Sequence, residues 1–141
     1  MTGTLRTTDP AVREKIIDAM TRQVSCTCQA MGGSGEVVIV PGYAALINSD
    51  EIVDVLVEAA TEVLGSEHIH PKKFPSLGVE DFSFFLEKAK GVFYHLGCAN
   101  KEKGITSPLH SQDFDIDEAC LKLGVELQAE LALRLLKRSL T

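Results

Sequence analysis

The C-terminal end of the chain carries the most regular pattern in the sequence, with apolar residues recurring at the spacing of one helix face. We expect a helix that begins at Asp115 or Asp117 and continues through Leu136. Lys137 and Arg138 follow at its C-terminal end, where the helix dipole favours cations. The apolar residues that recur along it are Leu121, Val125, Leu127, Leu131, Leu135 and Leu136.

The N-terminal part of the chain predicts a strand, a helix and a second strand. Residues 4–8 alternate and are rich in β-branched side chains, and residues 36–40 form a second β-branched run. Between them, Asp9 is placed to cap a helix that has Pro10 at its first position. A unit of about 40 residues rarely makes an independent core. We therefore expect it to pack on something further along the chain or on another chain.

The middle of the chain predicts two more helices and another strand. The first helix begins at Asn48, read as part of a capping box, and ends at Gly65. The second helix is expected over residues 76–90, with an apolar run at 92–98 that is typical of a buried strand. The expected fold class is therefore α/β.

Composition describes a soluble globular protein and excludes two classes of partner. Of the 141 residues, 45% are hydrophobic and 24% are charged, and the formal net charge is −6. The acidic balance argues against nucleic acid and against an anionic membrane surface, since both attract clustered lysine and arginine. No apolar run is long enough to span a bilayer, and no signal peptide is visible. The four cysteines are therefore interpreted as reduced thiols of a cytoplasmic protein.

The stretch from Pro108 to Glu118 holds the main candidate for a functional residue, His110, which would be a metal ligand. Other histidines and cysteines have plainer interpretations. Cys26 and Cys28 lie two apart on a predicted helix and so point to different sides, which favours space-filling residues over a metal pair. For His68 and His70, a solvated strand face is favoured over a metal pair on one face of a strand. For His95, a packed or hydrogen-bonded histidine is favoured over a ligand. A metal site built from His68, His70, His95, Cys98 or His110 is the remaining alternative.

Three stretches, taken in order and spacing, resemble one family. They are residues 3–13, residues 76–82 with their Gly-x-Glu-Asp-Phe motif, and residues 109–118. The family is that of the metal-dependent amidohydrolases, which include hippurate hydrolase, the N-acyl-amino-acid deacylases and the plant indole-acetyl-amino-acid hydrolases. These belong to the aminoacylase and carboxypeptidase group of metallopeptidases. The resemblance extends from about residue 3 to residue 138.

The resemblance implies a catalytic α/β domain interrupted by a smaller lid or dimerisation domain. Residues 1–46 resemble the second half of that lid, a partial strand–helix–strand unit. Residues 47–141 resemble the C-terminal part of the α/β metallopeptidase-like catalytic domain. The chain would thus be a shortened gene product, a trimmed piece, or one half of a split enzyme.

The resemblance also implies amide hydrolysis of N-acyl amino acids or similar small amides at a pair of divalent metal ions, zinc or manganese. His110 matches the last metal ligand, the acidic residues after it would position the loop and cap the last helix, and Glu80 is expected near the active site. The other ligands and the general base lie in an N-terminal half that is absent here. We therefore expect this chain to bind no metal and to be inactive alone. Its expected partner is the N-terminal half of a split enzyme or a second copy of itself in a homo-oligomer. A non-catalytic dimerisation module derived from the family is the alternative.

Overall fold

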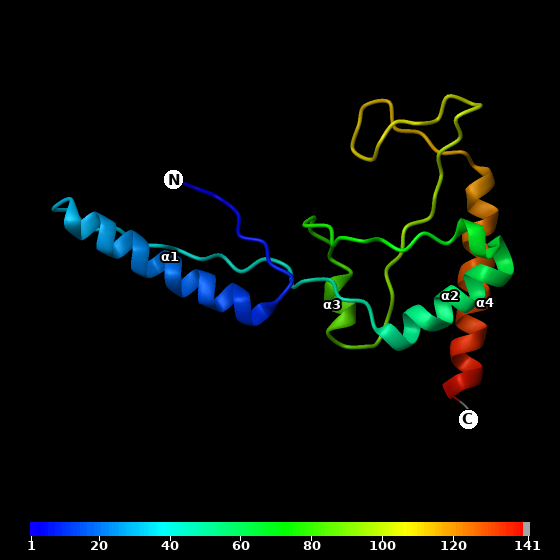
Figure 1. Cartoon of the computed structure of the whole chain (residues 1–141), viewed down its shortest axis with the longest axis horizontal. Coiled ribbons are helices and arrows are strands. Elements are labelled where there is room, and N and C mark those ends of the chain that lie inside the picture. The colour runs from blue at the N-terminus through cyan, green and yellow to red at the C-terminus, as the bar shows by residue number, and fades with distance from the viewer. Residues whose placement is uncertain (140–141) are drawn as a thin grey trace. The chain divides into compact units, whose positions relative to one another are not determined.

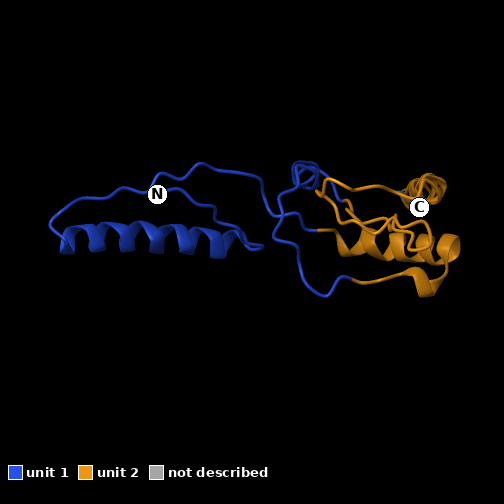
Figure 2. Cartoon of the chain, turned by 90° about the horizontal axis from the view of Figure 1, so that it is seen from above, with its two compact units in different colours: residues 1–47, 72–90 blue, residues 48–71, 91–141 orange. Residues whose placement is uncertain are grey.

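The computed structural model describes residues 1–139, which form two compact units (Figure 2). Unit 1 contains residues 1–47 and 72–90, and unit 2 contains residues 48–71 and 91–141. The regular elements are helical (Figure 1): α1 Pro10–Ala30, α2 Asp50–Leu64, the short 3₁₀ helix η1 Ser66–His68, α3 Ser83–Leu86 and α4 Ala119–Ser139. The division of the chain into a lid part and a catalytic part stays a prediction.

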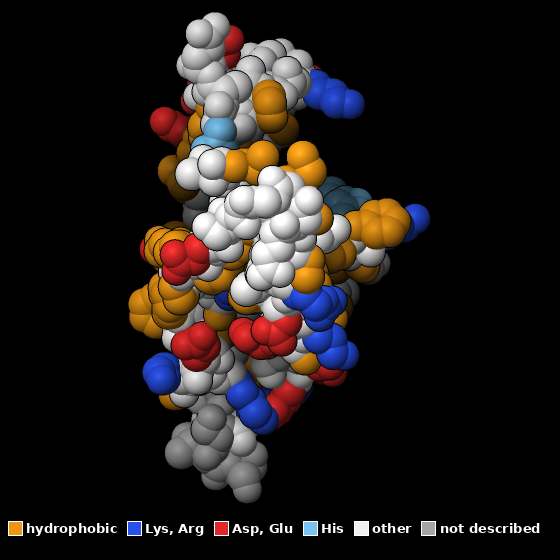
Figure 3. All heavy atoms as spheres, turned by 90° about the vertical axis from the view of Figure 1, so that its left-hand side faces the viewer, with side chains coloured by type: hydrophobic (Ala, Val, Ile, Leu, Met, Phe, Trp, Pro, Cys, Tyr) orange, Lys and Arg blue, Asp and Glu red, His pale blue; other side chains and the backbone are white. Residues whose placement is uncertain are grey.

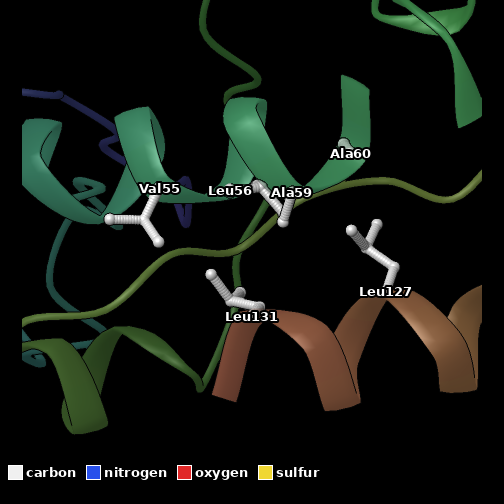
Figure 4. Close-up of a cluster of buried hydrophobic side chains, with 6 residues drawn as sticks. All are labelled: Val55, Leu56, Ala59, Ala60, Leu127 and Leu131. Carbon is white, nitrogen blue, oxygen red and sulfur yellow. The ribbon is translucent and has the colours of Figure 1, made fainter. Parts of the chain in front are cut away.

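The core of unit 2 lies between α2 and α4. Its buried apolar side chains are Val55, Leu56, Ala59, Ala60, Leu127 and Leu131. Figure 4 shows Leu131 of α4 pointing toward Ala59 of α2, and Leu127 lying on the side of Ala60. The two alanines let the helices approach closely, and the leucines fill the space between them. Burying one leucine side chain contributes roughly 1.5–3 kcal/mol relative to leaving it exposed.

The N-terminal end of α2 differs from the expected capping box. The cap residue is Ser49, and its side chain makes no capping bond in the described structure. Asn48 instead uses its side-chain amide on another segment, donating to the Phe93 carbonyl at 2.9 Å and accepting from the Phe93 N–H at 2.8 Å. The amide thus takes the place of a neighbouring strand. At the other end, Gly65 closes α2 at a φ of +92°, a conformation that glycine adopts without steric cost.

Helix α4 confirms the predicted C-terminal helix, although it begins at Ala119 and not at Asp115 or Asp117, and only some of its recurring apolar residues are buried. Leu127 and Leu131 are buried, at 2% and 9% exposure. Leu121, Val125 and Leu136 are 55%, 71% and 62% exposed, so these three of the recurring apolar residues lie outside the core. They lie about a third to nearly half a turn around the helix from the buried leucines.

Ion pairs join the solvent-facing edges of α2 and α4. Arg134 donates to Glu62 of α2 and, at 2.7 Å, to Glu130 one turn before it. Arg138 donates to Glu58 at 2.6 Å. The hydrogen bond that Arg134 donates to Glu62, followed by the one it donates to Glu130, raises the pKa of Arg134. Exposed ion pairs contribute little, so the apolar contacts supply most of the stability.

The long helix of unit 1, α1, has a capped start but no buried residue among those described. Asp9 caps α1, since its carboxylate accepts from the N–H groups of Ala11 and Val12 at 2.7 and 3.3 Å. This confirms the predicted start, with Pro10 in the first turn. The chain turns back at residues 31–35, where a side chain in place of Gly35 would collide with the Cys28 sulfur.

The helix expected over residues 76–90 is far shorter than predicted. Residues 75–80 are not helical, and α3 occupies only Ser83–Leu86. Gly78 disfavours an earlier start, because glycine weakens a helix. Two ring contacts accompany α3 within unit 1, Tyr43 against Phe84 at 5.3 Å and Phe82 against Phe85 at 5.7 Å.

The strands expected at 4–8, 36–40 and 92–98 are not confirmed. Within residues 1–139, β-type pairing is confined to one antiparallel bridge between Asn100 and Ile105. A strand is stabilised by partners that need not be close in sequence, so an alternating or β-branched pattern is not sufficient. The strand–helix–strand lid unit therefore reduces to helix α1 with non-helical segments on either side (Figures 1 and 2).

Exposed apolar side chains are frequent in unit 1. Val38 and Val40 are 76% and 84% exposed, and Phe74 and Phe85 are 78% and 67% exposed. Figure 3 shows hydrophobic side chains open to solvent between charged ones on the face in view. None of the helices in residues 1–139 combines the length and the apolar character that crossing a membrane requires. All four cysteines are free thiols.

Candidate functional site

The candidate site is the loop of unit 2 that runs from Ala99 to Glu118, the yellow-to-orange trace before α4 in Figure 1. Its first part is a tight turn closed by two backbone hydrogen bonds of 2.8 Å between Asn100 and Ile105. Its two ends meet where the Asp117 N–H donates to the Cys98 carbonyl at 2.9 Å. These hydrogen bonds therefore join the two ends of the loop to each other.

His110 lies at the exposed tip of this loop, in a left-handed backbone conformation with φ of +64°. Among residues 1–139 it is the one residue other than glycine with a positive φ. The turn around it is local, since Ser111 returns to the Pro108 carbonyl through its N–H at 3.3 Å and its hydroxyl at 2.8 Å. Such a conformation persists only where neighbouring structure imposes it, and it occurs preferentially at functional sites.

Asp117 carries most of the polar contacts at the base of the loop. Its carboxylate accepts from the Asn100 side-chain amide, from the Lys103 ammonium at 2.8 Å and from the Ala119 N–H at 3.2 Å. The hydrogen bond from Lys103, then that from Asn100, lowers the pKa of Asp117 to about 2. Because this pKa lies below the ordinary value of 3.8, the contacts stabilise the fold above about pH 4 and are lost as the pH falls toward 2.

Glu80, the second predicted site residue, belongs to unit 1 and precedes α3. It is half-buried, and its carboxylate lies 3.5 Å from the Phe82 N–H, while its carbonyl accepts from the Ser83 N–H at 3.3 Å. Glu80 thus closes the turn that leads into α3. Because His110 belongs to unit 2, each of the two residues is described within its own unit, and their proximity stays a prediction.

The remaining candidate ligands do not assemble. The segment 68–70 is not a strand, since η1 ends at His68 and both of its histidines are exposed. His95 is exposed too and meets Phe93 edge to face at 5.7 Å. Cys26 and Cys28 lie on α1 as predicted. No group of three or more histidine, cysteine, aspartate or glutamate residues within 1–139 is placed to hold a metal ion, so the independent metal site was wrong.

The donors that the described residues present therefore do not fit a catalytic metal ion. Such an ion needs about three protein ligands, and His110 belongs to no group of three such donors among the described residues. We derive no catalytic step through a metal for this chain by itself. That the isolated chain binds no metal ion stays a prediction, and measuring the metal content of the purified chain would test it.

The comparisons with known proteins give the family. The model of peptidase family M20/M25/M40 matches residues 6–134, and the chain belongs to this family, as the three sequence stretches indicated. It is 39% identical over 135 residues to thermostable carboxypeptidase 2 of Saccharolobus solfataricus, covering 95% of this chain and 33% of that protein. It is 33% identical over 96 residues to IAA-amino acid hydrolase ILR1-like 6 of Arabidopsis thaliana, covering 67% of this chain and 20% of that protein. No solved structure matches the chain.

The chain spans about a third of the length of the first of these relatives. Peptidases of this family are hydrolases and are generally metal-dependent. The role of His110 as a metal ligand stays a prediction, while Asp117 accepts from the Ala119 N–H at the start of α4, in line with the capping role expected of the acidic residues. Sequence reasoning missed Asn100 and Lys103, which lay in a segment interpreted only as a polar loop. Their partner is 17 and 14 residues away, beyond the reach of any local pattern.

Proposed function

We propose that this chain supplies the C-terminal part of a metal-dependent amidohydrolase that cleaves the amide bond of N-acyl amino acids or similar small amides, and that it is inactive alone. The observation that carries the proposal is the family match, which includes His110. The family match covers residues 6–134, yet no group of three donors occurs within 1–139. The other ligands and the general base would come from the remaining length of a family member, with zinc or manganese as the metal.

The exposed side of α4 supports this proposal. Leu121, Val125 and Leu136 lie on one side of the helix and are more than half exposed. Contiguous exposed apolar side chains mark surfaces that another part of a protein covers. An N-terminal partner segment would bury them at the same time as it completed the site.

The test is complementation. The chain is co-expressed with the matching N-terminal part of a family member, and the purified pair is assayed for metal content and for hydrolysis of hippurate, an N-acyl amino acid. We expect metal and activity in the pair and neither in the separate parts. His110→Ala should lower both, whereas His68→Ala, which changes an exposed histidine elsewhere in unit 2, should change neither. A well-folded pair without metal and without activity would contradict the proposal.

A second candidate, a dimerisation module, is favoured by one observation in unit 1. The β-branched segment 36–40 has Val38 and Val40 strongly exposed, and unpaired segments of this kind pair readily with another chain. Light scattering of the chain alone would show a stable homodimer, and Val38→Lys would dissociate it. A monodisperse monomer at high concentration would exclude this candidate.

A further inference from the structure

The loop that presents His110 is attached to unit 2 through few contacts. Its entry is Asn100, which turns the chain by accepting from the N–H groups of Glu102 and Lys103 at 3.0 and 3.2 Å through its side-chain oxygen. Its exit is Asp117, directly before α4. The side-chain nitrogen of Asn100 donates to Asp117 across the loop. One asparagine thus shapes the entry turn with one atom and holds the exit with the other.

Asp117 is bonded in several directions at once. Its N–H donates to the Cys98 carbonyl at 2.9 Å, and its carbonyl accepts from the Cys120 N–H at 2.9 Å in the first turn of α4. Its carboxylate adds the bonds to Asn100, Lys103 and the Ala119 N–H. The side chain is only 15% exposed, although the loop tip is open to solvent. No other carboxylate in the described loop bonds across it in this way.

We propose that Asp117 is a positioning residue, which holds the loop carrying His110 in one conformation by fastening the two ends of that loop together and to the start of α4. A cap of α4 needs only the bond to Ala119. The bonds to Asn100 and Lys103 instead close the entry turn onto the exit, and they leave residues 106–116 as a short span between fixed ends. The left-handed backbone of His110 lies within this span. The importance of Asp117 for catalysis rests on the proposed function, but its role in holding the two ends of the loop together does not.

The test measures loop order by NMR in the intact chain. In the unchanged chain we expect amide order parameters at His110 and Ser111 close to the roughly 0.85 of rigid backbone. With Asn100→Asp, two carboxylates face each other, and with Asp117→Asn the bond from Lys103 loses its charge. Each should lower the order parameters at residues 106–114 to below about 0.6, the value of flexible backbone.

The exchange of the two residues distinguishes positioning from simple destabilisation. Asn100→Asp combined with Asp117→Asn restores one amide opposite one carboxylate, beside the same lysine. We expect the double variant to recover most of the loop order that either single variant loses. Asp115→Asn is the matched control, since Asp115 bonds only the adjacent Ile116 N–H among the described contacts. It should leave the loop unchanged.

Two outcomes would overturn the proposal. One is a loop that stays ordered in both single variants. The other is a loss of loop order that is matched by equal loss of hydrogen-exchange protection in α2, because this would mean general unfolding. Failure of the proposed function looks different. The order parameters would behave as expected, while the complemented pair would lack metal and activity.

Discussion

Helices α1 and α4 have the same length, 21 residues each, and are stabilised by different means. Helix α4 buries Leu127 and Leu131 against α2 and adds ion pairs across the helix interface. Helix α1 has a side-chain cap at Asp9 and no buried residue among those described. Similar sequence patterns therefore produced a packed helix in one unit and a helix without a core in the other. The difference lies in whether the chain provides a facing surface, and no helical pattern contains that information.

The largest expected effect is in the core of unit 2. Leu127→Ala removes a side chain that is 2% exposed and should lower the free energy of unfolding of this unit by about 2–5 kcal/mol. Leu136→Ala on the same helix, at 62% exposure, should change it by less than about 0.5 kcal/mol. Urea unfolding followed by hydrogen exchange of α2 and α4 amides gives both values. Similar costs for the two would mean that the two sides of α4 do not differ as described.

The N-terminal caps of α1 and α2 test whether an unburied helix depends more on its cap than a packed helix does. Asp9→Ala removes two bonds to the first turn of α1 and should destabilise that helix by about 1 kcal/mol. Ser49→Ala at the start of α2 should have almost no effect, since the described Ser49 side chain makes no capping bond. Hydrogen-exchange protection of each helix is the measurement. Equal effects would show that α2 depends on its cap as much as α1 does.

The elements that could be predicted from sequence are those that depend on neighbours in sequence. Helix α1 with its Asp9 and Pro10 start follows from local hydrogen bonding and periodicity, and so does the stop of α2 at Gly65. The strands failed for the opposite reason, because pairing partners are remote. The backbone of Phe93, which was expected to lie in a strand, is hydrogen-bonded to the side chain of Asn48, 45 residues away.

The candidate site divides in the same way. His110 was found because of its local context and the family resemblance, and the acidic residues after it followed from the helix start. Its left-handed conformation and the contacts of Asn100 with Asp117 could not be read from the sequence. They depend on the way a loop closes, which is decided by side chains at both of its ends.

A smaller change in the free energy of unfolding is expected from the left-handed backbone conformation of His110. At a φ of +64°, glycine avoids the steric cost that any residue with a Cβ meets. His110→Gly should therefore be more stable than His110→Ala by about 0.5–1 kcal/mol, after the greater flexibility of glycine in the unfolded chain is subtracted. Urea unfolding of the two variants measures the difference. If the alanine variant were equally stable, the loop would have left the described conformation.

The smallest effect is expected at the outermost ion pair of the helix interface. Glu58 and Arg138 are 2.6 Å apart, but their side chains are 53% and 52% exposed, so water and salt screen them. Glu58→Gln should cost less than about 0.5 kcal/mol at low salt and nothing measurable in about 1 M salt. Glu14→Gln on α1 controls for the loss of one negative charge. A loss for Glu58→Gln that persists in high salt would mean that charge pairing, and not the leucines alone, distinguishes α4 from α1.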